Sequence, residues 1–419
     1  MSSDHWSDYW PDYWIVGARI IDGTGRDPVD GSAIHVVDGR IAHLGPAPAD
    51  ARTLDAGGLS ITPGLIDAHV HIGQSSDIGP SLRRELSPAE IAADMFTTCG
   101  TALDAGFTTV RDVGGIDAGV ARVVASGKVR GPRILQCGPI QCQTGGHGHL
   151  AADWEPTADW HDHAIPGLRA LSLLSDGPSE VRKNVRETFR RGADFIKMCV
   201  TGGVVSTHDK LTDAQFSVEE IAVAVEEAAA RGTYVTVHAH NNAGIRNAVR
   251  AGAKCVEHGS EIDEETATLM AGHGVALVPT LSVVKALLED ATEAGLPAGT
   301  KERVGPVLDG QISALRIAQA AGVKVGVGSD LIGPHQRLRG REITLRSEIE
   351  TPMEALVAAT RVNAEILRLD HETGTIEVGK LADLTVWSSD PLADPEVFGD
   401  PSQAAFVIKG GEVVKDTRR

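Results

Sequence analysis

The feature that most constrains the fold is an alternation, repeated eight times, of short apolar runs with longer stretches rich in Ala, Glu and Arg. The apolar runs have the length of buried strands. They are GLIDAHVH, FTTVRDV, PRILQCG, DFIKMCV, YVTVHAH, CVEHG, VALVPTL and VKVGVGSD. The stretches between them, such as EEIAVAVEEAAARG, place apolar residues at helical spacing and end in Gly. Eight such units predict an α/β protein built on a (β/α)8 TIM-like barrel.

A doubly wound open sheet is the alternative architecture, but no GxGxxG follows an early strand to support it. Both ends of the chain carry a different pattern: WIVGARIID and SAIHVVDGRIAHLG near the start, and ADLTVW and AFVIKGGEVVKD near the end, are typical of short strands with tight turns. We therefore predict a small β-sandwich domain built from residues 1–62 and 373–419. The barrel, residues 63–372, is inserted between these two segments.

The charge balance restricts the partners. Lys and Arg number 39 against 57 Asp and Glu, a formal net charge of -18, which argues against binding to nucleic acid or to anionic membranes. The sequence contains no run of the roughly 18 consecutive apolar residues that a membrane helix needs, and it starts with acidic residues where a secretory signal would be basic and then apolar. We expect a cytoplasmic protein.

Two local features concern assembly and redox state. Aromatic residues crowd the start of the chain, at Trp6, Tyr9, Trp10, Tyr13 and Trp14. Such a cluster favours packing against the β-domain or a homo-oligomer contact over a solvated tail. The five cysteines are an odd number without CxxC spacing, which indicates buried free thiols.

Polar residues interrupt the apolar runs where the strands should end. His69 and His71 close the first run, and alternation along a strand puts both side chains on the same face. Two imidazoles on one face can hold a divalent metal ion, although such a pair also occurs as simple hydrogen-bonding groups. Lys197, in DFIKMCV, would be costly to bury as an unpaired ammonium. It either pairs with a barrel carboxylate or reacts with carbon dioxide and bridges two metal ions as a carbamate.

Later runs end in further ligand-type residues. His238 ends the fifth run with His240 two residues on, His258 ends the sixth, and Asp330 ends the eighth as a candidate metal ligand and general base. The C-terminal strand ends of a barrel gather on one face, so these side chains should meet. The candidate metal ligands are His69, His71, Lys197, His238, His258 and Asp330.

With these residues the chain resembles the amidohydrolase superfamily, metal-dependent hydrolases in which a barrel is flanked by a β-domain from both termini. The resemblance covers essentially the whole chain, and TPGLIDAHVH is similar to the family's signature. It implies that His69 and His71 bind the more buried metal ion and that Lys197 is the carboxylated lysine that bridges two ions.

By the same resemblance, His238 and His258 bind the second ion, and Asp330 binds metal and shuttles protons. The spacing of twenty residues to the histidine of EHG selects His238 over His240, which is left as a substrate contact. Imidazole and carboxylate ligands accept zinc, manganese or cobalt, and we expect zinc first.

Several loops point to a branch of that superfamily. TGGHGH, FIKMCVTGG, VHAHN and GSDLIGPHQRLRGRE are similar to the imidazolonepropionase-like branch, which includes prolidase-like Xaa-Pro and Xaa-Arg dipeptidases and several detoxifying amidases. True imidazolonepropionases lack a bridging lysine and use one metal ion. Lys197 therefore argues against that particular activity.

The expected chemistry is hydrolysis of a C–N bond. Two cations sharing a water would lower its pKa and polarise a carbonyl, while Asp330 would move the proton to the leaving amine. His147, in TGGHGH, is the first candidate donor to the oxyanion, and His240 is the second.

The substrate is predicted from the loop after the eighth run. Arg337, Arg339 and Arg341 could pair with a substrate carboxylate, or could be solvated or paired with nearby glutamates. We expect a dipeptide or an N-acyl amino acid, with neutral amides, carbamates or phenylureas as the alternative. A purely structural role, known in relatives that lack the histidines, is the distant alternative.

Overall fold

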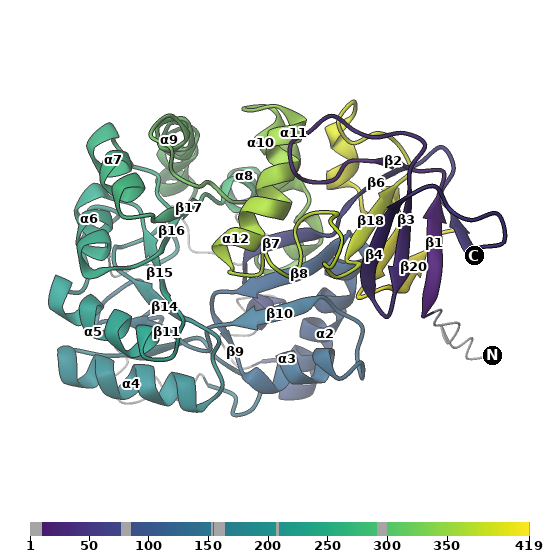
Figure 1. Cartoon of the computed structure of the whole chain (residues 1–419). Helices are drawn as coiled ribbons and strands as arrows, with labels where there is room; N and C mark the ends of the chain where they lie inside the picture. Colours follow the sequence, from purple (N-terminus) through teal and green to yellow (C-terminus); the bar gives the residue numbers. More distant parts are fainter. Residues whose placement is uncertain are drawn as a thin grey trace. The chain divides into compact units, whose positions relative to one another are not determined.

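The computed structural model describes residues 11–76, 85–151, 154, 164–206, 209–290 and 300–418. The aromatic residues Trp6, Tyr9 and Trp10, on which the homo-oligomer prediction largely rests, lie outside these ranges. The chain divides into two compact units (Figure 1). The first comprises Met1–Asp67, Gly100–Thr109 and Gly340–Arg419, and the second comprises Ala68–Cys99 and Val110–Arg339.

The first unit contains two sheets with one shared core. A four-stranded sheet has the order β4 (Arg40–Gly45), β3 (Ala33–Val37), β1 (Asp12–Val16) and β5 (Thr53–Asp55). A five-stranded sheet has the order β2 (Arg19–Ile20), β6 (Ser60–Pro63), β18 (Leu384–Trp387), β19 (Ala404–Lys409) and β20 (Glu412–Asp416). Ile15 and Ile34 from one sheet and Phe406 and Ile408 from the other belong to one buried apolar cluster.

Antiparallel pairing of β6 with β18 joins segments from both ends of the chain in one sheet. The exact domain boundaries at residues 62 and 372 remain a prediction. The helical elements of this unit are α10 (Arg341–Ser347), α11 (Pro352–Val357), η4 (Ala358–Val362), α12 (Asn363–Ile366), η5 (Pro395–Gly399) and η6 (Pro401–Gln403).

The second unit is an α/β assembly around a parallel sheet. Its six strands run in the order β13 (Ser172–Leu174), β11 (Ile140–Cys142), β14 (Ile196–Cys199), β15 (Val235–Ala239), β16 (Cys255–His258) and β17 (Ala276–Val278). All pairs in this sheet are parallel. A three-stranded sheet has the order β10 (Arg133–Gln136), β8 (Phe107–Asp112) and β7 (Leu65–Val70), and β12 (Arg169–Ala170) pairs with β9 (Gly115–Ile116).

Helices connect these strands, as parallel pairing requires. They are η1 (Ile72–Gln74), α2 (Pro88–Asp104), α3 (Ala118–Ala125), α4 (Pro178–Arg190), α5 (Val218–Ala229), α6 (Asn242–Ala251), α7 (Glu264–Gly272), α8 (Leu281–Asp290), α9 (Thr300–Ala320) and η3 (Gly333–Leu338). Ser217 begins α5 with a capping box, and Gly252 ends α6 with φ 99°. These caps satisfy backbone groups at helix ends that would otherwise lack partners.

The eighth apolar run, VKVGVGSD, was expected to be a strand, and this prediction is wrong. Within it only Val325 makes a β-bridge, to Leu277 of β17. The two glycines of this run explain the difference. A glycine inside a strand weakens it, and it often marks a place where another chain segment approaches closely. A Cβ at Gly328 would lie 2.5 Å from the Cβ of His69, so the segment can pass beside β7 only because Gly328 has no side chain.

Individual hydrogen bonds nevertheless place this segment between β17 and the end of β7. Gly326 N donates to Leu277 O at 2.8 Å, and Asp330 N donates to His69 O at 2.8 Å. Among the described residues the strands do not form a single closed barrel. The expected closed ring is instead a set of separate sheets, and individual backbone hydrogen bonds connect them. The consequence for function is that Asp330 lies beside His69.

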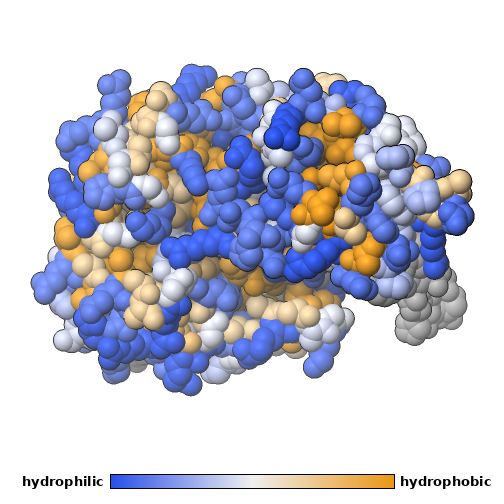
Figure 2. All heavy atoms as spheres, viewed as in Figure 1, coloured by the Kyte–Doolittle hydropathy of each residue, from blue (hydrophilic) through white to orange (hydrophobic). Residues whose placement is uncertain are grey.

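The surface combines hydrophilic and apolar side chains. Hydrophilic side chains cover most of the face shown in Figure 2, with apolar patches between them. Among the helices that the structure describes, none is both long and apolar enough to cross a bilayer.

Candidate metal centre

Two histidine rings at the end of β7 are held in a fixed orientation. Nδ1 of His69 lies 2.9 Å from Oε2 of Glu257, and Nδ1 of His71 lies 2.5 Å from the carbonyl oxygen of Gly114. Both acceptors favour a proton on Nδ1, so Nε2 is the nitrogen of each ring that could bind a metal ion in exchange for its proton. The two Nε2 atoms lie 3.2 Å and 3.1 Å from the same oxygen, Oδ1 of Asp330. The rings therefore present their ligand atoms to one point.

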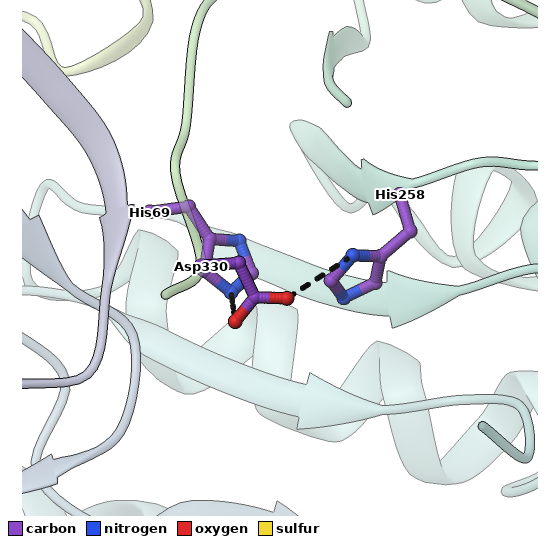
Figure 3. Close-up of side chains that lie close together, drawn as sticks. All are labelled: His69, His258 and Asp330. Carbon is purple, nitrogen blue, oxygen red and sulfur yellow. Dashed lines mark ion pairs between the residues drawn. The ribbon is translucent and has the colours of Figure 1, made fainter. Parts of the chain in front are cut away.

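His258 and Asp330 add further ligand atoms to the same place from neighbouring segments (Figure 3). Oδ2 of Asp330 lies 3.7 Å from Nδ1 of His258. One ligand atom from each of His69, His258 and Asp330 lies within 4.8 Å of the others, the spacing of a site that could hold a metal ion. Burial tends to raise the pKa of Asp330, but His69, His71 and His258 outweigh it and hold the pKa well below its usual range. Asp330 is therefore an anion at neutral pH.

Backbone conformation helps to direct these two side chains. His258 has φ 72° and Asp330 has φ 53°, so both lie in the left-handed region that non-glycine residues rarely occupy. This costs roughly 1 kcal/mol per residue and is typical of functional positions. At His258 it also interrupts the strand alternation, so Glu257 contacts His69 while the adjacent His258 reaches Asp330.

Further histidines form a cluster beside this point. The ring of His238, on β15, lies 4.5 Å from that of His258 and 4.9 Å from that of His240. His147 stacks on His238 with ring centroids 4.3 Å apart. Burial, reinforced by neighbouring positive charges, holds the pKa of His238 well below its usual range. Neutral imidazole is the form that binds a metal ion.

Lys197 lies on β14 with only 2% of its surface exposed. In the part of the chain that the structure describes, its ammonium group has no hydrogen bond and no ion pair, so the salt bridge considered from the sequence is not formed there. Its positive charge helps to lower the pKa values of Glu257, His238 and His258. Lys197 thus belongs electrostatically to the same site.

The other sequence-predicted residues have varied positions. Nδ1 of His240 lies 2.9 Å from Oγ of Ser260. Arg337 is exposed and donates to the carbonyl oxygen of Pro334, whereas Arg339 is buried. Arg341 begins α10 and belongs to the first compact unit.

Sequence reasoning missed the buried group that supports His69. Glu257 accepts hydrogen bonds from Arg111 Nη2 at 2.7 Å and from the hydroxyl of Thr236, in addition to its contact with His69. Burial raises the pKa of Glu257, but the charges of Arg111 and Lys197 outweigh it and keep Glu257 ionised. The available signal was a charged residue inside the apolar run CVEHG, the same signal that singled out Lys197.

The chain is similar to several known proteins over most of its length. The amidohydrolase family pattern matches residues 60–414. An ochratoxinase from Aspergillus niger is 34% identical over 85% of this chain and 75% of its own length. A crystal structure of a prolidase complexed with N-methylphosphonate-L-proline has a TM-score of 0.91 and 34% identity, covering 97% of this chain and all of that one. An imidazolonepropionase from Rhizobium rhizogenes is 27% identical over 88% of this chain and 89% of its own length.

A hydrolase acting on carbon–nitrogen bonds is the class that these likenesses define. The chain belongs to the amidohydrolase family, in its imidazolonepropionase- and prolidase-like branch. The fold neighbours imply a TIM-like barrel architecture.

Proposed function

We propose that the protein is a binuclear metal-dependent hydrolase that cleaves the amide bond of a dipeptide or an N-acyl amino acid. The observation that carries the metal dependence is the convergence of two Nε2 atoms, from His69 and His71, on one oxygen of Asp330. Each ring is anchored through Nδ1, as metal-ligating histidines usually are.

The donor set fits two divalent ions, with zinc as the first choice and manganese or cobalt as alternatives. His69, His71 and Asp330 would hold one ion, and His238 and His258 the other. Lys197 would bridge them after carboxylation, which explains why a buried ammonium lacks a partner among the described residues. When bound, such ions supply Lewis acidity that activates water and polarises a carbonyl.

Three residues of the chain would transfer the proton, stabilise the oxyanion and contact the substrate. Asp330, ionised because its pKa is low, accepts a proton from the attacking water and passes it to the leaving amine. Burial lowers the pKa of His147, but Asp209, Cys199 and Asp330 together outweigh burial and raise the pKa, so His147 can donate to the developing oxyanion. Burial lowers the pKa of His240 to about 3, so His240 is neutral and serves as a second contact to the substrate.

The proposed substrate class is supported by the sequence identity of this chain to two hydrolases. A prolidase that binds N-methylphosphonate-L-proline and an ochratoxinase are each 34% identical to this chain. A product that is an amino acid carries a free carboxylate, which a planar guanidinium can bind through two hydrogen bonds. Arg337, Arg339 and Arg341 are the candidates for this contact.

A paired substrate panel tests the proposal. Metal-loaded enzyme is assayed with Xaa-Pro, Xaa-Arg and N-acyl amino acids and with the same compounds amidated at the carboxylate, alongside anilides, carbamates and phenylureas. The proposal predicts higher kcat/KM for the free acids. Activity confined to the neutral compounds would overturn the substrate class and leave the metal chemistry standing.

A further inference from the structure

Two of the five cysteines end neighbouring strands side by side. Gln141 of β11 pairs with Met198 of β14, so Cys142 and Cys199 occupy the next position on each strand. Both thiols are free and buried. Each thiol also perturbs the pKa of the other, as expected of side chains that lie side by side. The topology therefore juxtaposes two thiols from segments that are more than fifty residues apart in sequence.

This juxtaposition meets the geometric needs of a disulfide. Adjacent strands lie about 4.8 Å apart, and neighbouring positions in register direct their side chains to the same face. A disulfide requires Cα atoms separated by about 4.4–6.8 Å. Other cysteines have different partners: Cys137 donates to Gly138 O at 3.3 Å, and Cys255 donates to Oε1 of Glu257 at 3.5 Å.

The thiol pair also adjoins the candidate site from both strands. Cys199 is two residues after Lys197 on β14, so the two side chains share a face. Cys142 leads into the loop that carries His147, and the backbone of Gly148 packs directly on the Cys142 sulfur. A Cβ at Gly148 would lie 2.1 Å from that sulfur. A displacement of the two sulfur atoms would therefore act beside Lys197 and on the loop of His147.

We propose that Cys142 and Cys199 are a site of reversible oxidation, at which a hydroperoxide converts the two thiols into a disulfide and thereby lowers hydrolytic activity. One thiol sulfur attacks the peroxide, the O–O bond breaks, and a sulfenic acid and an alcohol or water result. The second thiol then forms the S–S bond and releases water. An S–S bond is about 2.05 Å long, shorter than the contact distance of two unbonded sulfur atoms, so forming it would draw the two strand ends together.

Thiol counting tests the modification without reference to activity. Wild-type protein treated with hydrogen peroxide, then denatured and titrated with Ellman's reagent, should fall from five thiols to three. Peptide mapping should find Cys142 joined to Cys199. Cys142→Ser and Cys199→Ser should each keep four thiols, whereas Cys137→Ser, a matched buried control that can keep its bond to Gly138 O, should fall from four to two. Five persisting thiols, or a disulfide between other cysteines, would overturn the proposal.

The effect on catalysis rests on the proposed function. Oxidised enzyme should hydrolyse its amide substrate about tenfold more slowly or worse, because small displacements of positioned groups are costly, and dithiothreitol should restore the rate. A disulfide that forms without any loss of rate would refute the regulatory role. Absence of hydrolysis before oxidation would instead count against the proposed function, while the thiol count would still decide the modification.

Discussion

Glu257→Gln should weaken metal binding although Glu257 is not a ligand. The Glu257 carboxylate lies between Arg111, at 2.7 Å from Oε1, and His69, at 2.9 Å from Oε2. All three side chains are at most 1% exposed. The carboxylate therefore neutralises the buried charge of Arg111 and fixes the tautomer of His69, a candidate metal ligand.

The expected losses of stability and of metal affinity follow from these two contacts. Glutamine has no charge, so Arg111 would be buried without its counter-ion, and breaking a buried pair in this way costs about 3–5 kcal/mol. The glutamine amide group, when it faces His69, donates to Nδ1 and moves the ring proton to Nε2, which removes the lone pair that binds metal. Loss of such a supporting contact typically lowers metal affinity by about 10- to 100-fold.

The assay compares metal affinity, by competition with a chelator, and thermal unfolding of the metal-free protein. Glu227→Gln is the matched control, because Glu227 accepts hydrogen bonds from Arg182 and Arg186 outside the candidate site. Glu227 is buried as well, but both of its arginine partners are about a third exposed or more, so this substitution should leave metal affinity unchanged. Wild-type metal affinity in Glu257→Gln would refute the claim that Glu257 orients His69.

Three further predictions concern ligands, charge and substrate. Lys197→Ala should lower the metal content from two ions per chain to one or none by elemental analysis, and retention of both ions would contradict the carbamate. His147→Ala should lower kcat by about 10²- to 10³-fold with metal content intact; loss of metal would assign His147 to ligation instead. Arg339→Ala, which removes the buried member of the three candidate arginines, should raise KM for free-acid substrates and spare their amides; equal effects on acids and amides would argue against carboxylate recognition.

Periodicity predicted the strands that carry the site. Seven of the eight apolar runs contain strands of the structure, from β7 to β17. The run that fails, VKVGVGSD, contains two glycines whose role depends on a neighbour: Gly328 matters because His69 passes within 2.5 Å of where its Cβ would be. Such close approaches are set by tertiary structure, and a single sequence does not reveal them.

The candidate site, like the strands, was predictable in part. His69, His71, His258 and Asp330 follow from their places at the ends of apolar runs, and the structure brings them together. Glu257 interrupts the apolar run CVEHG, but a single sequence does not show that its partners are Arg111 and His69, which come from distant segments. The left-handed backbone at His258, which departs from simple strand alternation, likewise has no signature in the residue type.

The central claim, that a metal centre built on these histidines hydrolyses a C–N bond, is tested most directly by metal removal and restoration on one preparation. Bound metal per chain and the rate of hydrolysis of an N-acyl amino acid are measured together, before chelation, after it and after addition of zinc. The account predicts two ions per chain, loss of the rate with the metal, and recovery of both. Undiminished hydrolysis by metal-free protein, or a chain that binds no divalent ion, would contradict it.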